Sequence, residues 1–403
     1  MNRIPGLLLL ALVVIGGSVA RSRFTASVAR RAAAPDAAAL VARERRVRDQ
    51  DIAFYAARVA RDPSGAIDLA RLGGLYLARH RETGSTSDLA LAESAALRSA
   101  GNRGSRNPAA WQVLAASRIA RHRFVDALTA VEQVLAGDPD NAGARAAKGE
   151  ILLELGRYPE ADRLFTGLTL RRTEPSIAPR YARWLELRGR AGRASRLLEE
   201  ARIAAANDLA TPREHLAWFD LRLAELALKF EDHREAVRWA DSGLALVPDD
   251  ARLLATKARA LLGLGRPEQA LRLADSALGL RFDVATLIVL ASGWEQMGDT
   301  ALAGQYRRIL AANLAADPAN VHRGWSLFVL DHGGNADSIA TVARDDLKVR
   351  PDTYGFDLYA WALYRGGHVA EAAAAMHQAR AAETEDPLLD RHAAAIAAAA
   401  RTP

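Results

Sequence analysis

Apolar residues recur along most of this chain at the three- and four-residue spacing of one helix face, as at Leu152, Leu155 and then Leu164. Short polar segments with a central glycine separate these stretches, for example "ELGRYPEADRLF" at 154–165 and "GLGRPEQALRLA" at 263–274. The pattern predicts pairs of amphipathic helices joined by tight turns. No strand pattern supports an α/β catalytic domain.

The glycine turns recur at a regular interval. In six cases a small or apolar residue follows the glycine by five positions, and "RHRFVDALTAV" and "FEDHREAVRWA" keep the same phase without the glycine. The residues in this phase are Ala127, Ala161, Ala194, Ala236, Ala270, Ala303, Ile339 and Ala372, at intervals of 34, 33, 42, 34, 33, 36 and 33 residues. The sequence therefore predicts a repeat of about 34 residues. The one long interval is explained by an insertion in "RIAAANDLATPR" at 202–213.

A second set of mostly small residues stands twelve positions before the first. Its members are Ala115, Gly149, Ala182, Ala224, Ala258, Ala291, Leu327 and Ala360. Small residues in fixed phase on both sides of a turn allow two helices to pack closely, so each unit is predicted to be a helical hairpin. Proline ends the units, as in "GDPDN" at 137–141. We expect the turn glycines to adopt the left-handed conformation that ends the first helix; they are Gly156, Gly189, Gly265, Gly298, Gly334 and Gly367.

The unit at 108–141 resembles the tetratricopeptide repeat family. It has Trp111, Ala115, Ala127 and Pro139 at the places where that family's signature has Trp, a small residue, Ala and Pro. The match is weaker in other units, where the early Trp is replaced and the seventh unit has larger residues at the small positions. The resemblance implies an all-α fold, a right-handed superhelical solenoid of helical hairpins.

The resemblance divides the chain into regions. About eight repeats are expected at 108–386, after a divergent N-terminal helical hairpin region at 51–107 with a longer polar loop, "RETGSTS". The last segment, 387–403, is predicted to be a single closing helix. A solenoid needs its terminal hydrophobic face covered, and an alanine-rich helix suits that role.

The first 20 residues have the three-part pattern of a secretory signal. Arg3 precedes an apolar run from Leu7 to Ala20, which would span about 21 Å as a helix against a hydrocarbon core of about 30 Å. A cleaved signal is favoured, with an uncleaved membrane anchor or a core helix as alternatives, because Arg21 and other arginines follow the run. We expect an exported bacterial protein, periplasmic or extracellular or anchored to the inner membrane, with an Arg- and Ala-rich linker or loosely held helix at 21–50.

Composition changes this picture little. The 54 basic and 48 acidic side chains leave a formal charge of +6, with both signs interspersed and only four lysines among the basic residues. This arginine excess is typical of a GC-rich genome, and the acidic residues interrupt any basic track that nucleic acid would need. The absence of cysteine excludes disulfides, thiolate metal sites and a lipid-anchoring cysteine.

No catalytic motif accompanies the repeats: GxSxG, HExxH and the P-loop are all missing. Asp331 and His332 in "LDHGGN" are the nearest to a catalytic or metal-binding pair, but they fall at a hairpin turn. His80 and Glu82 fall in a polar loop. We therefore expect no enzyme activity, no cofactor and no metal.

The resemblance implies that the first helix of each repeat lines a concave surface. The residues at its exposed places are Glu150, Glu154, Arg183, Glu186, Glu225, Lys229, Arg259, Glu295, Trp361, Tyr364 and Arg365. A mixed charged groove that ends in aromatic residues suits an extended peptide or a partner helix. In the alternative, the charges are solvated helix faces and the two aromatics pack against the closing helix. The family's peptide-clamp residues for a terminal carboxylate are absent, so that activity is not implied.

The sequence thus predicts a non-catalytic scaffold that binds a peptide or partner protein on its concave face, with a possible tether through residues 1–20. The alternative is a structural assembly subunit that acts through the ends of the solenoid.

Overall fold

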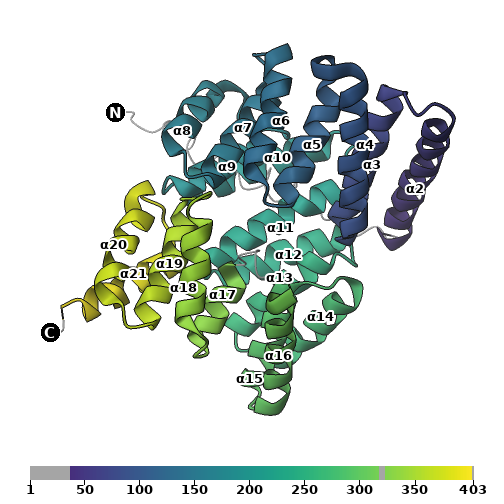
Figure 1. The fold of residues 1–403 in the computed structure, drawn as a ribbon. Coiled ribbons are helices and arrows are strands. Elements are labelled where there is room, and N and C mark those ends of the chain that lie inside the picture. The colour runs from purple at the N-terminus through teal and green to yellow at the C-terminus, as the bar shows by residue number, and fades with distance from the viewer. Residues whose placement is uncertain (1–36, 317–322, 402–403) are drawn as a thin grey trace, which may run out of the picture.

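The computed structural model describes residues 37–316 and 323–401. Within these ranges the chain forms 20 α-helices and three short 3₁₀-helices, with no strand (Figure 1). The predicted signal or anchor, residues 1–20, lies outside the described residues. In the ranges above, no helix combines the length and the apolar character needed to span a membrane. The fold is an all-α helical repeat, as the spacing of apolar residues predicts.

Helix α2 (Ala37–Arg61) occupies part of the expected linker. Residues 37–50 form its first half, and Val41 is buried there, so this part of the chain is a packed helix rather than a tether. The rest of the predicted linker, 21–36, lies outside the described residues. Only Val47 is apolar between Arg43 and Asp51, so a linker and a loosely held helix were both compatible with the sequence there.

The divergent N-terminal hairpin consists of α3 (Ala66–Thr83) and α4 (Thr86–Arg103). The loop between them is shorter than the expected "RETGSTS". Gly84 is left-handed, with φ of 72°, and the Ser85 side chain accepts a hydrogen bond from the backbone N–H of Asp88. A C-terminal glycine and an N-terminal serine cap therefore end one helix and begin the next with two residues between them.

Eight hairpins follow in regular order. Their helices are α5 (Pro108–Ala120) and α6 (Phe124–Gly137), α7 (Ala142–Glu154) and α8 (Tyr158–Gly167), α9 (Ala178–Leu187) and α10 (Ala191–Asn207), α11 (Arg213–Lys229) and α12 (His233–Leu246), α13 (Ala251–Gly263) and α14 (Pro267–Leu280), α15 (Val284–Gln296) and α16 (Thr300–Ala316), α17 (Arg323–Asp331) and α18 (Ala336–Asp346), and α19 (Thr353–Arg365) and α20 (Val369–Ala379). Helix α21 (Pro387–Ala399) closes the chain, and the short turns are η1 (Gly104–Arg106), η2 (Thr169–Arg171) and η3 (Arg380–Ala382). The insertion lengthens helix α10 to Asn207 as well as the loop that follows.

The small residues of the repeat lie where the paired helices meet. All seven alanines of the first phase are at most 1% exposed: Ala127, Ala161, Ala194, Ala236, Ala270, Ala303 and Ala372. A Cβ added to Gly149 would lie 2.7 Å from the ring of Phe165. A larger side chain at such a position would force the helices apart, which explains the repeat of small residues.

The turns follow the prediction with one correction. Gly333, with φ of 76°, takes the left-handed conformation instead of Gly334, whose N–H donates to the carbonyl of Val329. In the two units that lack glycine, His122 and Glu231 adopt the left-handed conformation, with φ of 56° and 60°. The backbone geometry of the turn is thus kept even where the residue type is unfavourable.

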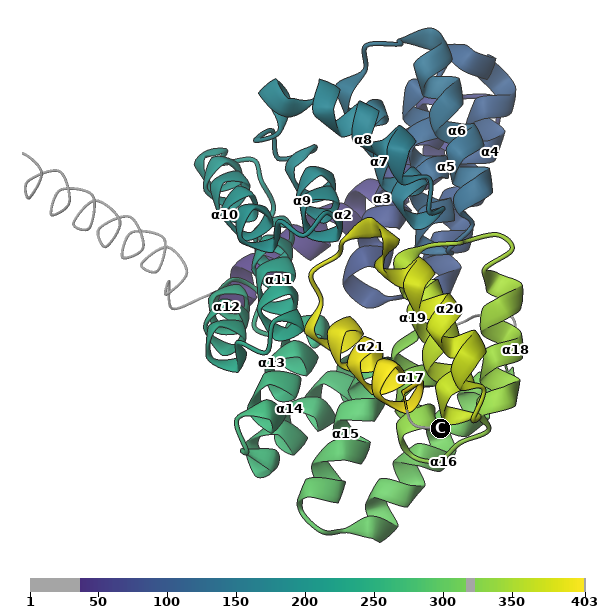
Figure 2. The ribbon, with the colours of Figure 1, turned by 90° about the vertical axis from the view of Figure 1, so that its left-hand side faces the viewer.

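The superhelix closes on itself. Figure 2 shows α21 near the end of α11, where Arg391 forms an ion pair with Glu231. The last repeats also reach the turns of the second and third hairpins, at Gly156 and Gly189. A Cβ on Gly156, at the α7–α8 turn, would lie 2.3 Å from the carbonyl oxygen of Pro351, so the two backbones touch. At the other end, Val41 of α2 packs into the cluster formed by α11, α12 and α13. Both ends of the described chain therefore contact its middle.

Candidate functional site

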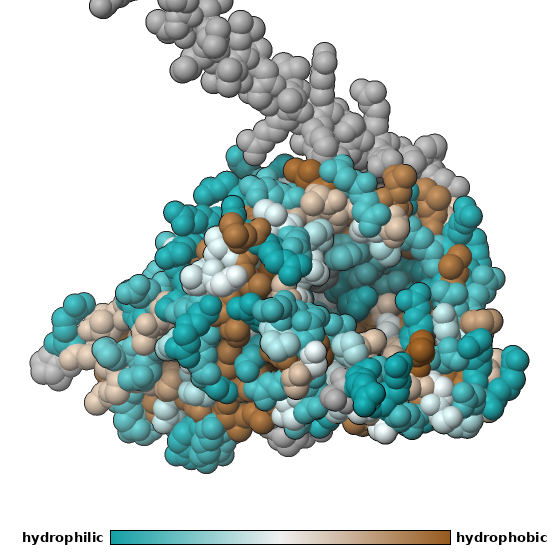
Figure 3. All heavy atoms as spheres, turned by 90° about the horizontal axis from the view of Figure 1, so that it is seen from above, coloured by the Kyte–Doolittle hydropathy of each residue, from teal (hydrophilic) through white to brown (hydrophobic). Residues whose placement is uncertain are grey.

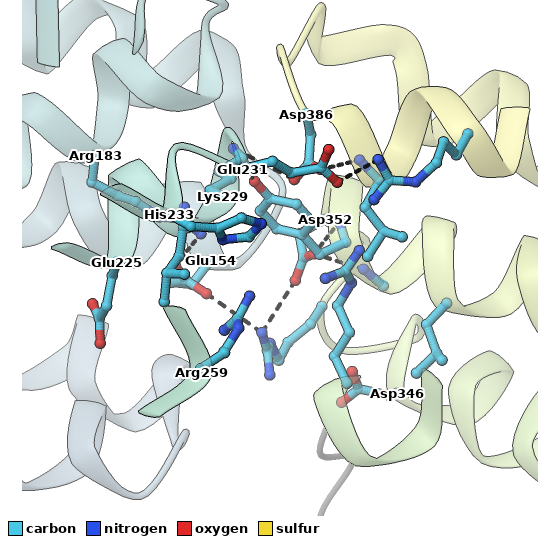
Figure 4. Close-up of a pocket in the computed structure, with 18 residues that line it drawn as sticks. Glu154, Arg183, Glu225, Lys229, Glu231, His233, Arg259, Asp346, Asp352 and Asp386 are labelled. Carbon is cyan, nitrogen blue, oxygen red and sulfur yellow. Dashed lines mark hydrogen bonds and ion pairs between the residues drawn. The ribbon is translucent and has the colours of Figure 1, made fainter. Parts of the chain in front are cut away.

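A polar cavity of about 520 Å³ lies where the last repeats meet the middle ones. Its walls come from the ends of α7, α9, α11 and α13 on one side, and from α17, α18, the α18–α19 loop, α19 and α21 on the other (Figure 4). The first helix of each repeat supplies most of the first wall. Seen from above, this molecule has a hollowed face in which hydrophilic residues gather (Figure 3).

Charges of both signs line the cavity in equal number. Six are cationic: Arg183, Lys229, Arg259, Arg323, Arg350 and Arg391. Six are acidic: Glu154, Glu225, Glu231, Asp346, Asp352 and Asp386. The cavity is thus nearly neutral overall and strongly polar, which suits a ligand that carries charge of its own rather than an apolar one.

Tyr354 of α19 lies among three of these cations. The guanidinium carbons of Arg183 and Arg323 are 5.4 and 4.8 Å from its ring centre, and Nζ of Lys229 is 5.5 Å away. Lys229 also donates a hydrogen bond of 2.8 Å to the Tyr354 hydroxyl. Cations over an aromatic face are attracted by its electron density. This cage therefore fixes α19 against α9, α11 and α17.

Ion pairs extend the contact on either side. Lys229 lies 3.0 Å from a carboxylate oxygen of Glu186 and 3.5 Å from one of Asp386, which caps the N-terminus of α21. Arg350 lies 3.4 Å from Glu154 and 3.2 Å from Asp352. The cavity is therefore framed by charges that bridge segments far apart in the sequence.

Burial and charge shift the pKa values of these carboxyl groups in opposite directions. Burial raises the pKa of Glu154 and of Asp352, although Arg183 and Arg350 oppose the effect. Burial would also raise the pKa of Glu186, but the charges of Arg183 and Lys229 lower it to about 2. Glu186 is thus the carboxylate that the site holds most firmly in its charged form.

Arg259 of α13 differs from the other cations. Among the described residues it has no hydrogen-bond or ion-pair partner, and its side chain extends into the cavity in Figure 4. The cavity walls desolvate the guanidinium and lower the pKa of Arg259, while Glu225 acts in the opposite direction. Within the described ranges, the buried Nε atoms of Arg323 and Arg350 and the Nδ1 atom of His233 at the same cavity also have no hydrogen-bond partner. The cavity therefore retains unused donors.

The structure brings together five of the residues predicted for the concave surface. Glu154, Arg183, Glu225, Lys229 and Arg259 all line the cavity. Two more lie next to it and are occupied within the chain: Glu186 binds Arg183 and Lys229, and Glu150 accepts a hydrogen bond of 2.8 Å from Arg180. The charged faces are therefore mostly paired rather than simply solvated.

The remaining predicted residues lie elsewhere and have structural contacts. Trp361 stacks on His392 of α21 with ring centres 4.0 Å apart, and its indole nitrogen donates to Asp331. Tyr364 stacks on Trp361, and Arg365 lies 3.6 Å from Asp331. Glu295 contacts His332 and Arg307. Trp361 thus packs against the closing helix and Tyr364 packs against Trp361, with both side chains half-buried, which favours the alternative interpretation over an exposed anchor at the end of a groove.

The two candidate chemical pairs are also structural. His332 bonds Glu295 and the carbonyl of Phe328 instead of pairing with Asp331. His80 lies 2.8 Å from the carbonyl of Ser85, and Glu82 binds Arg45 and Arg48 of α2. Within the described ranges, no cluster of His, Asp and Glu has the arrangement of a metal site.

Sequence reasoning missed the residues that close the cavity. Arg350 and Asp352 lie in "RPDT" at 350–353, another place where proline ends a repeat unit, and Asp386 lies just before the closing helix. The available signal was Tyr354, a large aromatic residue at the start of a first helix. However, its hydrogen-bond partner Lys229 lies 125 residues away in the sequence.

Three solved structures show similarity to this chain. PilW, a widely conserved type IV pilus biogenesis factor, is 20% identical, with 53% of this chain and 95% of that chain covered and a TM-score of 0.43. The MamA protein is 18% identical over 43% and 90% of the two chains, with a TM-score of 0.31. A tetratricopeptide repeat protein from Parabacteroides merdae ATCC 43184 is 12% identical over 70% and 96%, with a TM-score of 0.34. No curated protein matches the chain.

The sequence itself matches a family model. The match covers residues 118–183, from the end of α5 into α9, and the model describes the tetratricopeptide repeat. These residues include helix α6, the whole α7–α8 hairpin and parts of α5 and α9, with the left-handed turns at His122 and Gly156 described above. The chain therefore contains tetratricopeptide repeats, which the family match places at residues 118–183.

Proposed function

We propose that this protein is a non-catalytic scaffold that binds a protein partner, and that the polar cavity receives a charged segment of that partner. The observation that carries the proposal is Arg259, a cation without a partner among the described residues, at a cavity whose other charges are mostly paired. Arg259 is exposed to solvent at this cavity, and its planar donors match the two oxygens of a carboxylate. The preferred contact is therefore an acidic side chain.

The cavity residues support binding rather than chemistry. Their charges are equal in number, and no nucleophile lies beside a base in the arrangement that covalent catalysis needs. The alternative, an assembly subunit acting through the ends of the solenoid, has less support. Both described ends already contact the middle of the chain, through Val41 at one end and Asp386 at the other.

The test is affinity capture from native cell envelopes with the full chain and two matched variants. Arg259→Glu reverses the charge at the cavity, whereas Arg272→Glu reverses an exposed arginine of α14 that does not line it. We expect a protein that the wild type and Arg272→Glu retain and that Arg259→Glu loses. Retention of the same proteins by all three would overturn the role of the cavity.

The same proposal places the scaffold outside the cytoplasm, because residues 1–20 have the pattern of a secretory signal. Fractionation of cells that produce the full chain with a C-terminal tag tests this directly. We expect the protein in the periplasm, in the medium or with the inner membrane. Its recovery in the cytoplasm alone would contradict the proposal.

A further inference from the structure

A second hollow lies between α3 and α5, away from the polar cavity. It has a volume of about 700 Å³, and small or apolar residues from the two helices form its floor. On α3, Ala70, Gly74 and Ala78 follow one helix face at four-residue spacing, and Ile67 at its edge is 71% exposed. A Cβ on Gly74 would have only one neighbour within 4 Å, at 3.9 Å, so the floor is open.

Four arginines surround this groove, and no acidic residue lines it. They are Arg71 and Arg81 of α3, Arg103 at the end of α4, and Arg106 of η1. All four are exposed, and none has a side-chain hydrogen bond or ion pair within the described part of the chain. This differs from the polar cavity, where six acidic groups balance six cations. The groove thus carries unbalanced positive charge around an apolar floor.

We propose that this α3–α5 groove binds an acidic amphipathic segment of a partner protein, with apolar side chains on the floor and carboxylates against the arginines. Charge complementarity selects this occupant. Arginine forms two parallel hydrogen bonds with a carboxylate, and an apolar stripe on a peptide helix matches a groove between two helices. The inference concerns a surface separate from the polar cavity, so it holds whether or not the cavity binds a partner.

The groove fits two other anionic partners less well. It has no Trp, Tyr or Phe in its lining, whereas proteins that bind single-stranded nucleic acid stack bases on aromatic side chains. A membrane surface would meet the arginine rim, but the apolar floor lies between two helices. An acidic protein segment uses both the rim and the floor.

Selection from a library of random peptides displayed on phage, with the full chain as bait, tests the proposal. Selected peptides are then measured by fluorescence anisotropy against Arg71→Glu/Arg106→Glu, with Arg234→Glu/Arg272→Glu as the control for net charge at two exposed, unpaired positions. We expect peptides that combine Glu or Asp with apolar residues at helical spacing. Their affinity should fall at least about tenfold in the groove variant and stay unchanged in the control.

Three results would overturn the proposal. The first is the absence of any enriched peptide, and the second is enrichment of peptides that are not acidic or that bind the groove variant equally well. The third is that the wild type sediments with vesicles of anionic phospholipid and the groove variant does not, while both proteins bind the peptides equally well. That result would assign the arginines to a membrane surface. Circular dichroism of both double variants confirms that each keeps its helices.

Discussion

Lys229 in α11 and Tyr354 in α19 are joined by a hydrogen bond of 2.8 Å, although 125 residues separate them in the chain. A second link, between Tyr158 and Thr353, spans 195 residues: the Tyr158 hydroxyl accepts from the Thr353 N–H at 2.7 Å. These contacts bring the start of α19 against the end of α11 and the start of α8. The concave surface that the repeat suggests is therefore closed there into a cavity and is not an open groove.

Substitutions at two turn glycines with the same φ angle can separate the stability that comes from closure of the superhelix from the stability that comes from the turn itself. Gly156 and Gly265 both have φ of 67°, but only Gly156 faces another segment, the carbonyl of Pro351. Gly265→Ala should lose about 1–2 kcal/mol of unfolding free energy from the left-handed conformation alone. Gly156→Ala should lose about 1–3 kcal/mol more, because its Cβ cannot fit.

Urea unfolding of the two variants, followed by circular dichroism, measures the difference. Hydrogen exchange then shows where it arises. We expect faster exchange at 350–391 in Gly156→Ala alone. Equal losses of unfolding free energy in both variants would mean that the contact between Gly156 and Pro351 does not contribute to stability.

The bond between Lys229 and Tyr354 should show energetic coupling. Tyr354→Phe keeps the aromatic ring but removes the hydroxyl that accepts from Lys229, and Lys229→Met removes the charge. We expect a coupling energy of about 1–2 kcal/mol from the double-mutant cycle. Either single substitution already breaks the hydrogen bond to the charged Lys229, so the double variant should lose less stability than the sum of the two single losses. Additive losses would show that the two residues act independently.

Glu186 should make stability depend on pH. Its pKa of about 2 lies below the ordinary value of 4.5, so the unfolded chain binds the extra proton between these values. Its contribution is therefore fully present above about pH 5 and is lost as the pH falls toward 2, with a size of about 3 kcal/mol. Glu154 and Asp352, whose pKa values are raised, act with the opposite sign, so the wild type alone is not informative.

The difference between wild type and Glu186→Gln isolates the effect. Glu186→Gln should be the less stable protein at pH 6, and the gap should narrow steadily on acidification. A gap that stays constant from pH 6 to pH 3 would contradict the assigned charge network.

Trp361 should matter for stability rather than for recognition. It stacks on His392, so Trp361→Ala should release α21 from α19 at a cost of about 2–3 kcal/mol. Limited proteolysis should then cut near the α20–α21 connection, which the wild type protects. Unchanged stability together with loss of a captured partner would instead restore the reading of Trp361 as a binding anchor.

The repeat could be predicted from the sequence because it rests on local rules. Ala161 and Gly149 mark a helix–helix contact within one hairpin, and Gly156 marks the turn between its helices. The concave places of the first helices were also found in this way, and Glu154, Arg183 and Arg259 do meet at one cavity. Each of these positions depends on the geometry of a single repeat.

The closure of the superhelix could not be predicted in the same way. Whether Tyr354 reaches Lys229 depends on the small rotations between repeats, added over several hairpins and changed by the insertion before α11. No local pattern in "RPDT" distinguishes a boundary that faces solvent from one that contacts Gly156. For the same reason, stacking of Trp361 on α21 and its exposure in a groove were equally compatible with the sequence.

Distance measurement between two spin labels shows whether the last repeats contact the middle ones in solution. The chain has no cysteine, so Glu231→Cys and Arg391→Cys provide two unique labelling sites. In the wild type these exposed side chains form an ion pair of 2.6 Å between the α11–α12 turn and α21. Double electron–electron resonance and continuous-wave spectra of the labelled full chain should give one short, narrow distance distribution. A broad distribution at long distances would mean that the last repeats lie away from the concave surface in solution and that the superhelix is not closed.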